Sequence, residues 1–211
     1  LPEAMMNFLA FLGWNPGGDV EIMSPQEIVE HFSIDRIHKA GAMLNAEKLL
    51  WMNKEHMRKR PSEEQKAAIK QYLGDAFPDD MLTRLVPTII DRINVYGELI
   101  SIKDEEFGFF VKRPAIDKER VLFKDDGEHV AYNHLQQVKS LLLDADFSSP
   151  ESVKVAIMPY AEEVGKGSVL WPLRMSLSGQ EKSIDPFTIC YVLGKEESIR
   201  RIDEVCHTLS S

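Results

Sequence analysis

Apolar residues recur at intervals of three and four along most of this 211-residue chain. The first such stripe consists of Phe8, Leu9, Phe11 and Leu12, and it stops at Gly13. Residues at this spacing lie on one face of an α-helix, so the pattern predicts amphipathic helices packed around a core. Alternation of apolar and polar residues, which indicates a half-buried β-strand, is scarce. The sequence therefore predicts an all-α fold.

Helix start signals place several of these helices. Residues 24–27 (Ser-Pro-Gln-Glu) have the form of a capping box with proline at the first helical position, and residues 62–65 (Ser-Glu-Glu-Gln) have the same form ahead of a helix to about Leu73. Residues 81–93 present another apolar face, with a kink or break expected at Pro87. Further helical segments are expected at residues 94–102, 104–107, 117–123, 129–143 and 149–163, and in a last stretch marked by Ile199, Ile202, Val205 and Leu209.

Two interruptions divide the expected helices into units. Arg58, Lys59 and Arg60 form a basic cluster directly before Pro61, and residues 125–127 (Asp-Asp-Gly) break the apolar pattern. We therefore expect three helical units, at residues 1–60, 61–127 and 128–211.

The charge balance limits the kinds of partner that the chain can bind. Its net charge is -9, and no third of the sequence is net basic. Affinity for nucleic acid that does not depend on sequence normally comes from a basic surface, so this balance argues against a non-specific binder. Any contact with RNA must use a few placed cations on an acidic body, which favours selectivity over general adhesion.

Other features indicate a soluble, cytoplasmic piece of a longer protein. No uninterrupted apolar run is long enough to cross a bilayer, and the start Leu1-Pro2-Glu3 is neither an initiator methionine nor a cationic signal region. We expect no membrane partner. Cys190 and Cys206 are expected to be reduced core residues.

Catalytic and metal-binding patterns are missing from the sequence. There is no glycine-rich phosphate loop, no G-x-S-x-G elbow, no H-E-x-x-H helix and no paired C-x-x-C pattern. His31 and His38, near Glu27 and Asp35, are the best candidate metal ligands, but their spacing spans an expected helix end. Exposed polar positions are the preferred interpretation. We therefore expect no catalytic residue, metal or cofactor in this chain.

Several segments, in this order and spacing, resemble the part of bacterial-type glutamyl-tRNA synthetase, a class I enzyme, that follows its catalytic domain. The segments that carry the resemblance are residues 7–14, 24–32, 45–58, 172–179 and 193–196, with residues 1–5 (Leu-Pro-Glu-Ala-Met) at the start. The family's His-x-Gly-His-like motif and Lys-Met-Ser-Lys-Ser-like loop, both catalytic, do not occur here. The resemblance implies a C-terminal, stem-contact and anticodon-binding fragment, built from elongated helical bundles in a superhelical arrangement.

The resemblance also implies a division of roles. Residues 1–60 correspond to the stem-contact domain, and residues 61–127 and 128–211 to two anticodon-binding subdomains. The implied partner is the anticodon loop and stem of the glutamate tRNA, bound by a monomer. The parent enzyme, a glutamate-tRNA ligase, would use ATP and magnesium in a catalytic domain absent from this chain.

Two arginines are singled out by the resemblance. Arg92 corresponds to the arginine for the last anticodon base, and Arg174 to the one that reaches the middle base. A guanidinium can bond a base edge with two N–H groups or stack on an unpaired base. Arg174 also has a local argument, because it is one cation among apolar anchors where Pro172 is expected to interrupt the backbone. The plain alternative for Arg92 is a surface arginine beside Asp91.

The first anticodon base is assigned to the segment that follows Gly179. The implied RNA-binding residues there are Ser183, Ile184, Pro186 and Phe187. Glu181 and Asp185 depart from the family pattern in this segment. The alternative is a polar loop between two helices, with Phe187 buried.

Weaker RNA-binding candidates have structural alternatives that we prefer. Trp14, Trp51 and Trp171 have the faces that bases stack on, but core positions are expected for all three. The cluster at residues 58–60 is either a contact to the tRNA stem or a solvated joint. At the level of function, the main alternative is an acidic, all-helical protein-interaction module that does not bind tRNA, and a metal or carboxylate enzyme ranks last. The related glutaminyl enzyme is disfavoured because its anticodon-binding part is a β-barrel.

Overall fold

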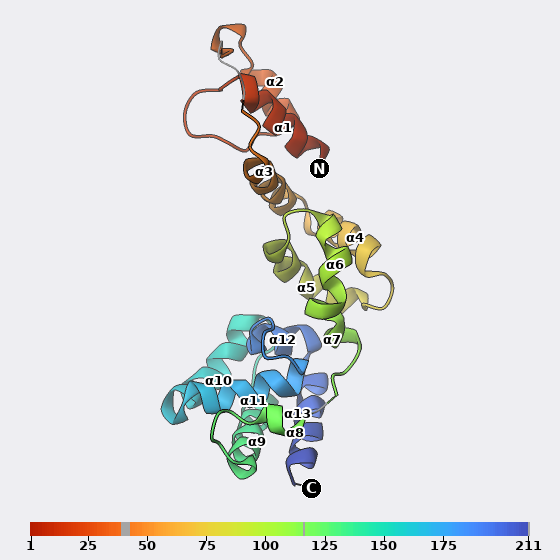
Figure 1. Cartoon of the computed structure of the whole chain (residues 1–211), viewed down its shortest axis with the longest axis vertical. Helices are drawn as coiled ribbons and strands as arrows, with labels where there is room; N and C mark the ends of the chain where they lie inside the picture. The colour runs from red at the N-terminus through yellow and green to blue at the C-terminus, as the bar shows by residue number, and fades with distance from the viewer. Residues whose placement is uncertain (39–42, 116, 211) are drawn as a thin grey trace. The chain divides into compact units, whose positions relative to one another are not determined.

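The computed structural model describes residues 1–38, 43–115 and 117–210, and the regular elements of this part of the chain are helices (Figure 1). One isolated bridge, between Trp14 and Ile37, is the only β-type pairing among these residues. The elements are α1 (Pro2–Gly13), α2 (Pro25–His31), η1 (Ile34–Arg36), α3 (Ala46–Lys59), α4 (Ser62–Leu73), α5 (Asp79–Arg92), η2 (Tyr96–Glu98), α6 (Leu99–Ile102), the π-helical turn η3 (Lys103–Phe107), α7 (Gly108–Val111), α8 (Lys118–Val121), α9 (Glu128–Asp144), α10 (Pro150–Val164), α11 (Lys166–Ser178), α12 (Pro186–Leu193) and α13 (Lys195–Ser210). The all-α prediction is confirmed.

The chain divides into two compact units. Unit 1 comprises Leu1–Asp75 and Leu85–Ser101, and unit 2 comprises Ala76–Arg84 and Ile102–Ser211. Helix α5 therefore contributes residues to both. The three-part division at residues 60 and 127 stays a prediction.

Unit 1 is built on the packing of α1 against α2 and α3. A small cluster of Trp14, Met23 and Ile28 fills the space beside α1. The capping box at the start of α2 is confirmed, because Ser24 Oγ accepts from the Glu27 amide at 3.2 Å and Glu27 Oε2 accepts from the Ser24 amide at 2.7 Å.

The second predicted capping box is wrong. Pro61 is the N-cap of α4, so Ser62 is already helical and makes no capping bond. The glutamine of the motif has another role: Gln65 is buried, and its Nε2 donates to the carbonyls of Met57 at 2.9 Å, Arg60 at 3.0 Å and Arg58 at 3.3 Å. Gln65 thereby satisfies carbonyl groups left open at the end of α3.

Unit 2 is a bundle of its five longer C-terminal helices (Figure 1). Helix α9 packs against α11 and α13, and α10 packs against α11 and α12. The helices predicted at 129–143 and 149–163 are confirmed as α9 and α10, and Ser149 caps α10 by accepting from the Ser152 amide at 3.1 Å. The two cysteines are confirmed as buried free thiols, and burial raises the pKa of Cys190 to about 12.

No helix ends at the two prolines where an interruption was expected, and the alternative of a kink at Pro87 stays a prediction. Helix α5 continues through Pro87, and α11 continues through Pro172, which lies buried in the middle of the helix. Proline costs one backbone hydrogen bond in a helix. In α11 the neighbouring Val169 and Leu173 are fully buried, and their packing outweighs that cost.

The remaining predictions on single side chains are mixed. His31 and His38 are exposed, as expected. Trp14 is a core residue with 2% of its surface exposed, whereas Trp51 is 38% exposed and Trp171 is half-buried, so the core assignment is right only for Trp14. Among the described residues, no helix is both long enough and apolar enough to cross a bilayer.

Candidate nucleic-acid interface

The segment assigned to the first anticodon base is a short loop, residues 179–185, between α11 and α12 of unit 2. It begins at Gly179, which ends α11 in the left-handed conformation with φ +66°. A Cβ at Gly179 would lie 2.4 Å from the Cβ of Pro114, so both the backbone angle and the close contact require glycine here. The loop therefore leaves α11 in a direction fixed by its first residue.

Arg174, on the last turns of α11, holds the other end of the 179–185 loop. Its Nη1 donates to Ser183 Oγ at 2.8 Å, to the Ser183 carbonyl at 3.0 Å and to the Ile184 carbonyl at 3.0 Å. Burial lowers the pKa of Arg174, and Asp185 acts in the opposite direction. An arginine remains charged under such a shift, so the loop wraps around a partly desolvated cation.

The predicted site residues divide into buried and accessible ones. Ile184, Pro186 and Phe187 are buried, and Ser183 is half-buried. The exposed residues of the loop are Glu181, Lys182 and Asp185.

Asp185, which departs from the family pattern, is the N-cap of α12. Its Oδ1 accepts from the amides of Thr188 at 2.9 Å and Phe187 at 3.1 Å. The departure therefore has a local structural role, because these amides have no partner within the helix.

Two further contacts tie the 179–185 loop to the segment that precedes α9. Gln180 Nε2 donates to the carbonyl of Glu105 at 2.5 Å, in the π-helical turn η3, and Glu181 pairs with Arg120 at 3.4 Å. Gln180 and Pro114 belong to no motif that marks them in the sequence. The local signal is Gly179, a glycine at a helix end.

Arg92 is the last residue of α5 and is exposed in unit 1. The neighbouring Asp91 accepts from Arg58 Nη2 at 2.9 Å, and its carbonyl accepts from Lys54 Nζ at 2.6 Å. The end of α5 therefore carries a group of cations around one carboxylate. Arg92 and Arg174 belong to different units.

The basic cluster at residues 58–60 is engaged within unit 1. Arg58 also pairs with Glu55 at 2.7 Å, and Lys59 Nζ donates to the Ile22 carbonyl at 3.2 Å. Arg60 binds Glu3 through Nε at 2.8 Å and Nη2 at 2.6 Å, which joins the end of α3 to the start of α1. This cluster is therefore a structural joint of unit 1.

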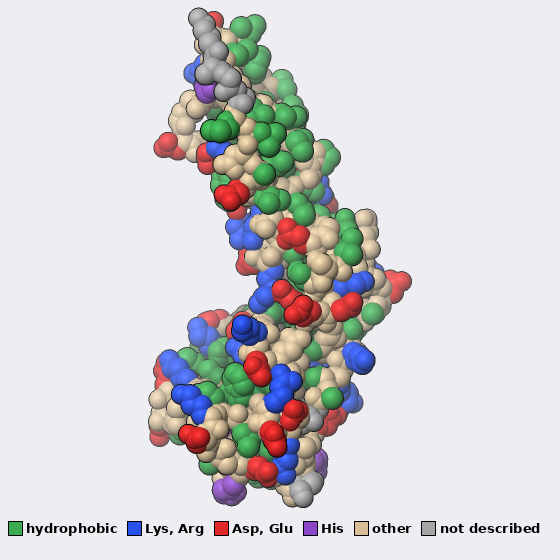
Figure 2. Space-filling model, in the orientation of Figure 1, with side chains coloured by type: hydrophobic (Ala, Val, Ile, Leu, Met, Phe, Trp, Pro, Cys, Tyr) green, Lys and Arg blue, Asp and Glu red, His purple; other side chains and the backbone are tan. Residues whose placement is uncertain are grey.

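The surface charges on the drawn face of unit 2 agree with the sequence, in which no third of the chain is net basic. Figure 2 shows Lys and Arg side chains interspersed with Asp and Glu over the drawn face of unit 2, without a broad basic area on that face. A site for RNA on such a surface depends on individual cations and on shape.

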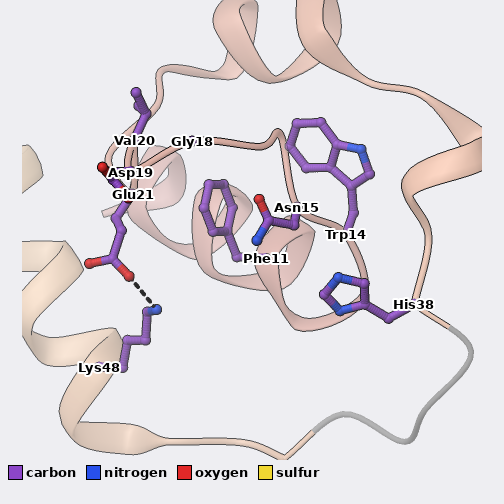
Figure 3. A pocket seen from close by; sticks show the side chains of 9 residues that line it. All are labelled: Phe11, Trp14, Asn15, Gly18, Asp19, Val20, Glu21, His38 and Lys48. Atoms are coloured by element: carbon purple, nitrogen blue, oxygen red, sulfur yellow. Dashed lines mark hydrogen bonds and ion pairs between the residues drawn. The ribbon is translucent and has the colours of Figure 1, made fainter.

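Unit 1 has a pocket of about 430 Å³ that the sequence did not reveal (Figure 3). Figure 3 shows Phe11 and Trp14 on its wall, with Lys48 paired to Glu21 at 2.8 Å on the opposite side. The full lining is Phe11, Trp14, Asn15, Gly18, Asp19, Val20, Glu21, His38 and Lys48. No cluster of histidine, cysteine or carboxylate side chains suited to a metal occurs here or elsewhere in the described part of the chain.

Comparison with known proteins identifies the family to which the chain belongs. Residues 52–206, which include α5, Arg92, Arg174 and the whole 179–185 loop, match the family model described as "Anticodon binding domain". The chain belongs to the anticodon binding domain family. The family assignment agrees with the sequence resemblance and disfavours the acidic protein-interaction alternative.

Curated relatives of this family member are glutamate-tRNA ligases. The ligase of Phocaeicola vulgatus is 35% identical over 99% of the chain and 41% of its own length, and that of Flavobacterium johnsoniae is 32% identical with the same coverage. A solved glutamate-tRNA ligase from Elizabethkingia meningosepticum, in complex with its amino acid, has a TM-score of 0.75 at 29% identity over 99% of the chain. The chain spans about two fifths of the length of these relatives.

Proposed function

We propose that this chain is the C-terminal, tRNA-binding part of a glutamate-tRNA ligase and that it recognises the anticodon of the glutamate tRNA. The observation that carries the proposal is that the anticodon-binding family match spans the Arg174-centred loop. The extended similarity to glutamate-tRNA ligases, over nearly the whole chain, supports the choice of tRNA.

Arg174 is suited to the middle anticodon base. Its Nη1 is bound to the loop, and the proposed contact to the base edge uses the other N–H groups of the guanidinium fork. Because Ser183 and Ile184 fix one side of the fork, little side-chain entropy remains to be lost on binding.

The first and last bases have separate candidates. Ser183 lies beside Arg174 and offers a hydroxyl, while the buried Ile184, Pro186 and Phe187 form the packed floor under the first base. The exposed Arg92 at the end of α5 is the candidate for the last base. Residues 1–60 are the candidate for the stem contact.

The chemistry belongs to the remainder of the ligase. There the enzyme would activate glutamate with ATP and magnesium and attach it to the tRNA. In the part of the chain that the structure describes, no residue cluster is suited to hold a metal, so no step of that reaction is assigned to it. We propose a cytoplasmic, monomeric enzyme, with this part supplying tRNA register and selection.

Substitution of Arg174 tests the proposal. For Arg174→Ala we expect binding of the cognate tRNA to weaken by about 1–3 kcal/mol, the scale of a lost two-bond base contact. A tRNA already altered at the middle anticodon base should lose much less. Filter-binding titrations with both tRNAs measure the difference. Lys154→Ala, which removes an exposed cation on α10 of the same unit, is the charge control. Equal losses for both tRNAs would remove Arg174 from base recognition.

A further inference from the structure

A buried arginine lies directly behind the start of the 179–185 loop. Arg201, on α13, is only 2% exposed. Its Nη1 donates to the carbonyl of Leu177, two residues before Gly179, and its Nε donates to Glu197 Oε1 at 2.9 Å. Burial lowers the pKa of Arg201, and Glu197 opposes that shift. A buried guanidinium is costly unless it is paired, and here Glu197 and the carbonyl of Leu177 supply the partners.

Glu197 is shared with two further arginines: the neighbouring Arg200 of α13, which donates to Glu197 Oε2, and Arg113, from a distant part of the sequence. Arg113 Nε donates to Glu197 Oε1 at 2.9 Å, and its Nη2 donates to Oε2 at 3.3 Å. Arg113 also pairs with Glu204 at 2.9 Å. The residue that follows Arg113 is Pro114, which makes the close contact with Gly179.

One carboxylate therefore fixes both sides of the Gly179–Pro114 contact. Through Arg201 it fixes the end of α11, and through Arg113 it fixes the segment that carries Pro114. We name Arg113, Glu197 and Arg201 the arginine clamp. The clamp acts on the first residue of the 179–185 loop, and Arg174 holds the loop at Ser183 and Ile184.

The loop needs such restraint, because its exposed residues Glu181, Lys182 and Asp185 supply little packing of their own. Ordering a free backbone costs conformational entropy. A loop that is ordered before binding does not incur that cost when the ligand arrives.

We infer that the arginine clamp is a positioning device that sets the 179–185 loop in its RNA-binding shape and so contributes to anticodon selection. This inference rests on the proposed function. The clamp residues do not touch RNA in this account; they act through Gly179 and the loop that follows it.

The test is Arg113→Gln in the intact protein, with Glu197→Gln as a second variant. Arg113 is partly exposed, so its removal leaves the buried Arg201 and Glu197 pair in place. We expect selectivity, the ratio of Kd values for a tRNA altered at the first anticodon base and for the cognate tRNA, to fall about three- to tenfold. Amide hydrogen exchange should accelerate at residues 179–188 and stay unchanged in the middle of α13.

Lys139→Gln is the matched control. It removes the 2.6 Å ion pair between Lys139 and Asp203, which joins α9 to the same helix α13 without touching the loop. If the ion pairs of Arg113 only stabilised the fold, Lys139→Gln and Arg113→Gln would change anticodon selectivity and exchange at residues 179–188 to the same extent.

The outcomes separate the inference from the proposed function. If the unchanged protein selects the cognate anticodon and both clamp variants keep that selectivity, the positioning role is overturned. If the unchanged protein shows no anticodon selectivity, the proposed function fails, while loop exchange still decides whether the clamp orders the loop. Exchange at residues 179–188 that is unaltered in both variants contradicts the inference in either case.

Discussion

At the scale of single residues, His56 is a buried titratable side chain of unit 1. It lies on α3, and its Nε2 is 3.0 Å from Oδ1 of Asn7 on α1. Because that oxygen also accepts from the Met23 amide at 3.0 Å, the imidazole is the donor in this contact. Burial lowers the pKa of His56, although the charge of Glu3 acts against it; the charges of Lys59 and Arg60 lower the pKa further.

This shift predicts that acid destabilises unit 1. When the pH falls below about 6.5, the unfolded chain takes up a proton that the folded His56 does not, so the free energy of unfolding decreases. His56→Gln keeps an N–H donor and removes the titration. We expect the free energy of unfolding of the variant, measured by urea titration, to change less between pH 8 and pH 5 than that of the unchanged chain.

The exposed His31, exchanged for glutamine, serves as the control for this comparison. A pH dependence in His56→Gln as steep as in the unchanged chain would show that other groups are responsible.

At the scale of elements, the C-terminal end of α3 depends on Gln65 of α4. We expect Gln65→Ala to lower the free energy of unfolding by about 1–3 kcal/mol, because buried carbonyls at the end of α3 lose their donor. Gln71→Ala, an exposed position on the same α4, should change it by less than about 0.5 kcal/mol. Chemical denaturation of both variants measures the difference, and equal small effects would contradict the capping role.

The elements also show what the sequence could predict. Helices α9 and α10 were predictable because their apolar spacing and the Ser149 cap are local signals. The continuity of α11 was not, because the cost of Pro172 is local whereas the packing that outweighs it comes from other helices. The role of Gln65 was missed for the same reason, because it depends on another helix. Its motif predicted a cap for α4, whereas its side chain caps the end of the preceding helix α3.

The candidate site also has a part that the sequence could predict and a part that it could not. The family resemblance pointed to Arg174 and to the segment after Gly179, and the structure brings Arg174, Ser183 and Ile184 together. The arginine clamp could not be predicted, since Arg113 and Glu197 are 84 positions apart and no local pattern links them.

At the scale of the whole molecule, exposed apolar side chains are unevenly distributed. Among the described residues, the large exposed apolar side chains that follow Trp51 in the sequence are Ile100, Val111, Val130, Leu143, Val155 and Val164. Those up to and including Trp51 are more numerous: Met5, Met6, Leu9, Val20, Val29, Phe32, Ile34, Ile37, Met43, Leu44, Leu50 and Trp51. Figure 2 shows hydrophobic atoms gathered over α1 and α2 of unit 1. Contiguous apolar surface of this kind promotes association.

We propose a monomer only for the intact enzyme; for the isolated 211-residue chain we expect binding of hydrophobic dyes and self-association through this part of unit 1. Leu9→Lys, at a position 55% exposed on α1, should reduce both effects. Leu143→Lys, at a position 54% exposed on α9, should leave them unchanged. Dye fluorescence and sedimentation velocity measure the two effects. Equal dye binding and equal self-association of the two variants would contradict the assignment of these effects to unit 1.

The proposed function makes one central claim about the molecule: an acidic helical scaffold selects a tRNA through a few arginines and one restrained loop. Hydroxyl-radical footprinting of the glutamate tRNA with the intact protein tests this claim most directly. We predict protection of the three anticodon nucleotides in the presence of the protein, and loss of protection at the middle nucleotide with Arg174→Ala. Anticodon nucleotides that are cleaved equally with and without the protein would contradict the claim.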